Sequence, residues 1–126
     1  MHGEIKYKDI TEKIIGTSFE VHTFLGNGFQ EVIYQRALAW EFSQANLSYV
    51  REFEQEIFYK ELSEPIGTRR ADFVVEGKVL VELKAIIALE DVHLAQVLNY
   101  LKAYKLEVAL LINFGSKSLT FKRLVL

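Results

Sequence analysis

The segment RRADFVVEGKVLVELKA, residues 69–85, constrains the fold more than any other part of this chain. Two apolar runs flank a Glu-Gly pair, which predicts two strands, at about 69–75 and 78–85, joined by a short turn. Asp72, Glu82 and Lys84 lie within these runs, at positions where an aliphatic side chain would pack better. The chain therefore has either a solvated strand face here or a chemical use for the three charges.

Side chains alternate along a strand, and this alternation divides the segment into two faces. One face is wholly apolar and is expected to be core; it carries Phe73, Val75, Val79, Val81 and Leu83. The opposite face carries Asp72, Val74, Leu80, Glu82 and Lys84. The three charges share one face only if the two strands pair with even parity. We therefore predict a three-residue loop or a bulge, with Gly77 in a left-handed conformation.

On such a face Asp72 and Glu82 would be neighbours, and their repulsion would raise the pKa of one of them. A divalent cation between the carboxylates would remove this repulsion, and Lys84 could then reach a substrate oxygen or a water. This arrangement is typical of metal-assisted phosphodiester cleavage. The alternative interpretation of the same three residues is a salt-bridged, partly solvated sheet face.

The composition limits the chemistry further. The chain has 126 residues, which suits a single domain spanning 1–126, and its formal net charge is −2, so a nucleic-acid site must be a local basic patch. It contains no cysteine, so a metal must be held by oxygen or histidine ligands, which favours Mg²⁺ or Mn²⁺. The N-terminal MHGEIKYKDI has no apolar signal core and no run reaches membrane-span length, so we expect no membrane association and a cytoplasmic location.

Apolar periodicity and turn residues divide the rest of the chain into helices and strands. One helix is expected to begin at a Thr11 cap and to end at the GNG of 26–28. A second, at about 29–45, is apolar over much of its circumference and is expected to be well buried. The remaining predicted elements are strands at 48–60, 107–114 and 119–126, a loop at 61–68 and a helix at 90–105. This order predicts an α/β fold with a mixed central sheet flanked by helices.

Two of these helices carry polar residues that could face the charged strand positions. On the helix at 90–105, Gln96 and Tyr100 are one turn apart and could reach a scissile phosphate, a water or a nucleic-acid backbone; alternatively they are polar residues at a helix edge. Glu31 enters the second helix, where it is either paired or metal-bound, or simply an acid that the helix dipole favours.

With these residues in view, the chain closely resembles the GxxExxY proteins, a branch of the PD-(D/E)xK nuclease-like superfamily. The naming motif is Gly28, Glu31 and Tyr34, and the resemblance extends over IIGTSFEVHTFLGNGFQEVIY, RADFVVEGKVLVELKA and HLAQVLNYLKAYKLEVALLINFG. It implies a restriction-endonuclease-like αβββαβ core, here with an extra N-terminal helix and a C-terminal β-hairpin strand. It also implies a Mg²⁺ or Mn²⁺ site.

The resemblance assigns roles to individual residues. It implies that Asp72 is the aspartate of the PD half-motif, that Glu82 and Lys84 are the ExK, and that Gln96 and Tyr100 are the QxxxY element of RecB-like nucleases. The expected metal ligands are Asp72, Glu82 and Glu31, and the expected catalytic set is Asp72, Glu82, Lys84, Gln96 and Tyr100. Basic residues that could steer a nucleic-acid backbone are Arg69, Arg70, Lys102 and Lys105.

The expected function is metal-dependent hydrolysis of phosphodiester bonds in nucleic acid, in DNA rather than RNA. The alternative is a non-catalytic module that retains the nuclease fold and binds nucleic acid or protein, and a homodimer is compatible with either. Secondary candidates for a ligand set are Glu20, His22 and His93. Because residues two apart diverge on a helix, Glu20 and His22 are interpreted first as a surface or supporting pair.

Overall fold

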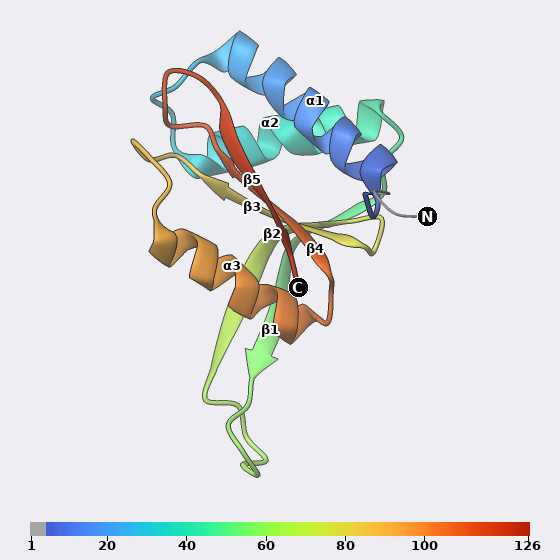
Figure 1. Ribbon diagram of the computed structural model, residues 1–126, viewed down its shortest axis with the longest axis vertical. Coiled ribbons are helices and arrows are strands. Elements are labelled where there is room, and N and C mark those ends of the chain that lie inside the picture. Colours follow the sequence, from blue (N-terminus) through green and yellow to red (C-terminus); the bar gives the residue numbers. More distant parts are fainter. Residues whose placement is uncertain (1–4) are drawn as a thin grey trace.

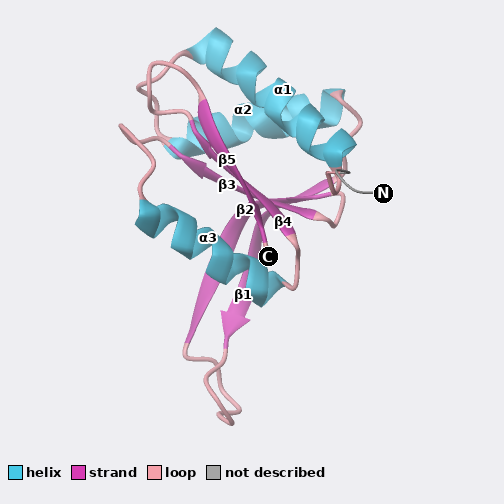
Figure 2. Ribbon diagram, viewed as in Figure 1, coloured by secondary structure: helices cyan, strands magenta, loops and turns pink. Residues whose placement is uncertain are grey.

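The computed structural model describes residues 5–126. Residues 1–4, the first part of the N-terminal segment in which no signal sequence is expected, lie outside the described residues. The fold has three layers, with a five-stranded sheet between two helices on one face and one helix on the other (Figures 1 and 2). The elements are α1 Lys8–Leu25, α2 Glu31–Gln44, β1 Tyr49–Ile57, β2 Gly67–Val75, β3 Val79–Lys84, α3 Asp91–Tyr104, β4 Val108–Asn113 and β5 Thr120–Val125. No helix of the described part is long and apolar enough to cross a membrane.

The strands lie in the order β1-β2-β3-β4-β5, so neighbours along the chain are neighbours in the sheet. Only β3 and β4 run parallel, and α3 makes the crossover between them; the other three pairs are antiparallel. This topology confirms the mixed sheet and the predicted αβββαβ core, with α1 added before it and β5 forming a hairpin with β4.

The sheet buries a separate core on each face. The cluster under α1 and α2 includes every residue of the predicted apolar face, namely Phe73, Val75, Val79, Val81 and Leu83. Val74 and Leu80 pack instead under α3. The connection has three residues, since Val75 pairs with Val79, and Gly77 has φ +64°. The predicted parity and the predicted left-handed glycine are therefore both confirmed.

Two expectations about the first helices were wrong. The helix α1 begins at Lys8, and Thr11 lies buried one turn inside it, where its hydroxyl donates to the Lys8 carbonyl instead of capping the helix. The second helix is not buried all round, because Trp40 is 61% exposed and Ile33 is also exposed. Tyr34, Gln35, Leu38, Ala39 and Phe42 form its buried face. Apolar residues on the outer face of α2 therefore misled the sequence interpretation.

The strands β1 and β2 exchange faces at one position. Phe73 packs under α1 and α2, whereas Ala71, two residues earlier, packs under α3, although a regular strand would place both on one face. The pairing register is constant on both sides of this point, and only the Glu52–Asp72 pair is missing from the ladder. Glu52 has φ +54°, a conformation that non-glycine residues rarely adopt. A local twist thus reverses the strand faces at Asp72.

Tyr104, at the end of α3, supports the strands beside this reversal. Its buried hydroxyl accepts a hydrogen bond from the Ala71 N–H at 3.0 Å and donates one to the Phe53 carbonyl. Its ring also packs edge-on against Phe53, with the ring centroids 5.4 Å apart. The hydroxyl therefore ties α3 to both strands next to the position where the ladder is interrupted.

Tyr104→Phe is expected to lower the free energy of unfolding by about 1–3 kcal/mol, because it leaves the Ala71 N–H buried without an acceptor. Urea denaturation followed by circular dichroism measures this loss. Tyr59→Phe, at an exposed tyrosine, is the matched control. Equal stability of Tyr104→Phe and wild type would show that the hydroxyl does not hold the strands together.

Candidate active site

Asp72 and Glu82 interlock where β2 and β3 part. The backbone ladder between these strands ends at the Phe73–Val81 pair. Beyond it, the Leu83 N–H donates to Asp72 Oδ2 at 2.8 Å, and the Asp72 N–H donates to Glu82 Oε1 at 3.2 Å. Each carboxylate therefore accepts a hydrogen bond from the opposite strand, and the two acids are fixed against each other at the opening.

Both acids are held where ionisation is unfavourable. Burial, followed by the neighbouring charge of Asp72, raises the pKa of Glu82 to about 8. Burial also raises the pKa of Asp72, against the opposing effects of the Leu83 N–H and the Gln35 amide. Perturbed carboxyl groups of this kind are common at functional sites, because the protein keeps them in place despite the cost.

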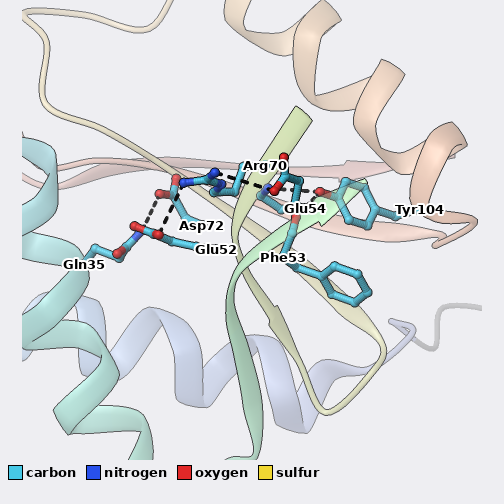
Figure 3. Close-up of polar contacts among 8 residues, drawn as sticks. Gln35, Glu52, Phe53, Glu54, Arg70, Asp72 and Tyr104 are labelled. Carbon is cyan, nitrogen blue, oxygen red and sulfur yellow. Dashed lines mark hydrogen bonds and ion pairs between the residues drawn. The ribbon is translucent and has the colours of Figure 1, made fainter. Parts of the chain in front are cut away.

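Gln35 is a site residue that the sequence interpretation missed. It is 5% exposed, and its side-chain amide donates to Asp72 Oδ1 at 2.7 Å, a contact drawn in Figure 3. Its Oε1 is buried and has no hydrogen-bond partner among the described residues. The available signal was its spacing, because Gln35 follows Glu31 by four residues and so lies on the same side of α2.

Lys84 and Glu31 complete the charged surroundings of the two acids. Lys84 forms no ion pair within the described part of the chain, yet its charge lowers the pKa of Asp72, Glu82 and Glu31. Burial of the Glu31 carboxyl raises its own pKa, and the charge of Asp72 raises it further. The structure thus places one cation and a third acid within electrostatic reach of the interlocked pair.

The two residues of the predicted QxxxY element differ in their surroundings. Burial and the charge of Glu82 raise the pKa of Tyr100. The guanidinium of Arg69 stacks over the Tyr100 ring, 4.9 Å from its centroid. Gln96 is exposed, and its side chain takes part in none of the hydrogen bonds among residues 5–126. Tyr100 of this pair therefore lies within electrostatic reach of Glu82 and Asp72.

Two of the three motif residues, Tyr34 and Gly28, have structural roles in the 26–34 segment. The Tyr34 hydroxyl donates to the Gly26 carbonyl at 2.6 Å and accepts from the Phe29 N–H at 3.2 Å. Its ring stacks on Phe114, with centroids 4.7 Å apart. Gly28 has φ +108°, which a side chain would oppose. Tyr34 and Gly28 thus shape the turn that presents Glu31 at the start of α2.

The four basic candidates lie in different surroundings. Arg70 lies between Glu52 and Glu54, 3.6 Å from each carboxylate (Figure 3). Arg69 is the neighbouring residue and so points to the opposite face, which the strand reversal makes the α3 side, where Arg69 lines a hollow together with Lys102. Lys105 directly follows α3 and is its C-cap residue, in a left-handed conformation. Arg69 is therefore the basic candidate with a direct contact to the site, through Tyr100.

The secondary candidates lie apart from one another. His22 is buried, and its Nε2–H donates to the Ser116 carbonyl at 3.0 Å. Glu20 lines an apolar hollow between α1 and α2. His93 Nδ1 accepts the Glu90 N–H at 2.9 Å and so caps the start of α3. Each of these three residues has a local partner or surface of its own, and they form no common group of metal ligands among residues 5–126.

Within residues 5–126, no group of three or more histidine or acidic side chains is close enough together to hold a metal ion. Asp72 and Glu82 are thus two carboxylate donors, and the structure does not show Glu31 as a third donor in a preformed cluster. One further oxygen atom is uncommitted beside Asp72, since Gln35 Oε1 has no hydrogen-bond partner among the described residues.

Comparison with known proteins gives a family. A model described as the PD-(D/E)XK nuclease superfamily matches residues 8–124. A solved structure titled "Crystal structure of SSO0001" is similar with a TM-score of 0.47 and 15% sequence identity, over 92% of this chain and 77% of that chain. A search of curated proteins gave no match.

Proposed function

Because this chain belongs to the PD-(D/E)XK nuclease superfamily, we propose that it is a metal-dependent nuclease acting on DNA in preference to RNA. The observation that carries the proposal is the interlock of Asp72 and Glu82 at the parting of β2 and β3, with the Lys84 charge beside it. Membership of the GxxExxY branch stays a prediction.

Nucleases of this superfamily generally use divalent metal ions, and the adjacent carboxylates of Asp72 and Glu82 are donors of the kind that such an ion prefers. Two buried carboxylates that repel each other are costly unless a cation lies between them, and oxygen donors are the ligands that Mg²⁺ and Mn²⁺ prefer. Asp72 and Glu82 would hold the ion together with the Leu83 carbonyl, and Glu31 would contribute directly or through water. When bound, such an ion activates water and offsets developing negative charge.

The protein residues then have separate tasks. Lys84 holds the attacking water or stabilises the charge that develops on the phosphoryl oxygens. Tyr100 orients the phosphate or Lys84, and Gln96, one turn earlier on α3, assists when substrate is bound. Gln35 holds Asp72 in place through its amide hydrogen bond. The reaction is hydrolysis, in which water adds to phosphorus and one ester oxygen leaves with a proton.

A nuclease assay with purified protein tests the proposal. Single- and double-stranded DNA and RNA are incubated with Mg²⁺, Mn²⁺, Ca²⁺ or EDTA, and products are separated on denaturing gels. We expect cleavage of DNA with Mg²⁺ or Mn²⁺ and none with EDTA. Absence of cleavage of every substrate with every metal, by a protein that is folded, would refute the proposed activity.

Gln35→Ala is expected to weaken Mn²⁺ binding about 10- to 100-fold, which is typical when a residue that orients a metal ligand is removed. The physical reason is that the Gln35 amide lowers the pKa of Asp72 and fixes one of its oxygens. Isothermal titration with Mn²⁺ measures the effect, and Gln44→Ala, at the exposed end of α2, is the control. Equal affinity in Gln35→Ala and wild type would limit Gln35 to packing.

A second candidate function is supported by a different surface. Phe24 is 88% exposed and Trp40 is 61% exposed, and both line the hollow between α1 and α2. Such a surface is more typical of a protein contact than of catalysis. A non-catalytic module would keep this surface and bind neither Mn²⁺ nor nucleic acid at Asp72 and Glu82, so the titration separates the two functions.

A further inference from the structure

Arg69 is a cation whose hydrogen-bonding capacity is largely unused. Its guanidinium stacks over the Tyr100 ring, and its Nε and Nη1 atoms are buried without a hydrogen-bond partner among the described residues. Buried donors are nearly always paired, because an unpaired one costs free energy. An arginine kept in this state is prepared for an acceptor that binds from outside the chain.

The hollow beside Arg69 has room for such an acceptor. It has a volume of about 450 Å³ and lies between the β1–β2 arm and α3. Its lining residues are Glu56, Ile57, Phe58, Arg69, Asn99, Lys102 and Ala103. The positive charges of Arg69 and Lys102 outnumber the single negative charge of Glu56, and Asn99 offers an amide donor, so the hollow favours an anion. The planar fork of arginine matches the paired oxygens of a phosphate.

The hollow is joined to the candidate active site through Tyr100. One face of the Tyr100 ring is covered by Arg69, while the charges of Glu82 and Asp72 also act on the Tyr100 hydroxyl. Arg69 also lies three residues before Asp72 on the same strand. A phosphate bound by Arg69 would thus lie beside Tyr100 and near the strand position of Asp72.

We propose that this hollow is a subsite for a backbone phosphate of the nucleic-acid strand, adjacent to the phosphate that is cleaved. Arg69 holds the phosphate through its guanidinium, and Lys102 adds a second positive charge. The inference rests on the proposed nuclease function for the identity of its ligand. The contact is independent of base sequence, because it involves only the backbone.

The test measures binding without cleavage. A fluorescein-labelled single-stranded 12-mer DNA is titrated with protein in EDTA at several salt concentrations, and anisotropy gives the affinity. Arg69→Gln and Lys102→Gln are each expected to bind about 10-fold more weakly, with the salt dependence reduced by about 0.7 in slope for the lost phosphate contact. Lys122→Gln, on the edge strand β5 at the far side of the sheet, is the control and should stay within about 2-fold of wild type.

A neutral backbone linkage locates the contact. One phosphate of the oligonucleotide at a time is replaced by an uncharged methylphosphonate. At one defined linkage this replacement should lower the affinity of wild type about 10-fold. Arg69→Gln should not respond to the same replacement. The subsite would be overturned if both Arg69→Gln and Lys102→Gln bound the DNA as tightly as wild type. It would also be overturned if methylphosphonate lowered the affinity of wild type and of Arg69→Gln equally at every linkage.

The outcomes separate the two proposals. Cleavage together with unchanged binding by both variants would refute the subsite and leave the nuclease function standing. Binding through Arg69 without cleavage under any metal would support the subsite and refute the hydrolytic function. Failure of wild type to bind the oligonucleotide at all would overturn the subsite directly. Lys102 is exposed, so its variant tests the hollow even if replacement of Arg69 disturbs folding.

Discussion

Lys84→Ala is expected to cleave DNA at least about 100-fold more slowly than wild type while binding Mn²⁺ with similar affinity. The reason is the position of Lys84, which forms no ion pair within residues 5–126 yet acts electrostatically on Asp72, Glu82 and Glu31. An ammonium that is not neutralised by a close partner is free to act on substrate. Initial rates at saturating DNA and Mn²⁺ measure the effect.

Comparison with other variants distinguishes a loss of catalysis from a loss of metal binding. Asp72→Ala should lose both activity and Mn²⁺ binding, because Asp72 is a proposed ligand, whereas Lys84→Ala should lose activity alone. Lys78→Ala, in the β2–β3 turn at the other end of the hairpin, should keep both. A Lys84→Ala protein that cleaves as fast as wild type would remove the lysine from the mechanism and point to another general acid or charge donor.

The metal-free protein is expected to lose stability as pH rises from about 5 to about 8, by on the order of a few kcal/mol. The ordinary pKa of a glutamate is 4.5, and burial and Asp72 raise that of Glu82 to about 8 in the folded state. Between these values the folded state keeps a proton that the unfolded state has lost. Folding is therefore progressively less favoured until the pH exceeds the folded-state pKa.

Other groups do not reverse this trend. The pKa values of Asp72 and Glu31 are also raised, so they act in the same direction. Glu76 accepts two hydrogen bonds from Ser48 that lower its pKa, so its contribution to the pH dependence of stability lies at lower pH than this range. Glu82→Gln should flatten the pH dependence, because it removes the main titrating group.

Urea denaturation in EDTA at half-unit pH steps measures the slope, and Glu54→Gln, at an exposed strand position, is the control. At pH 8, Mn²⁺ at about 100 times its dissociation constant should raise the free energy of unfolding by about 2.7 kcal/mol, since it binds only the ionised carboxylate pair of the folded protein. A stability that is flat from pH 5 to 8 in wild type would show that Glu82 ionises normally. The proposed cation between the acids would then lose its electrostatic basis.

In the hairpin of residues 69–85, the alternation of side chains along the strands was sufficient to predict which positions are buried. Five apolar positions of one parity all lie in the core under α1 and α2, because burying a run of such side chains is the largest favourable term available to that segment. The same argument required a three-residue connection with a left-handed glycine, and Gly77 provides it. The pairing of Asp72 with Glu82 follows from that register.

The same reasoning failed where a strand departs from regular geometry. No pattern in the sequence marks the reversal at Glu52 and Asp72, since Glu52 is not a glycine and the pairing register does not change. For that reason the opposite surroundings of Arg69 and Arg70 could not be assigned. The reversal is stabilised by contacts distant in sequence, above all the Tyr104 hydroxyl from α3.

The sequence by itself determined the order of elements, the apolar face of the hairpin and the residue types able to hold a divalent cation, because these depend on local periodicity and side-chain chemistry. Only the tertiary structure decided that Gln35 holds Asp72, that Arg69 rather than Arg70 contacts Tyr100, and that His22 serves the 115–118 turn. Each of these contacts joins segments far apart in the chain. Their geometry depends on how the layers pack, which no local pattern records.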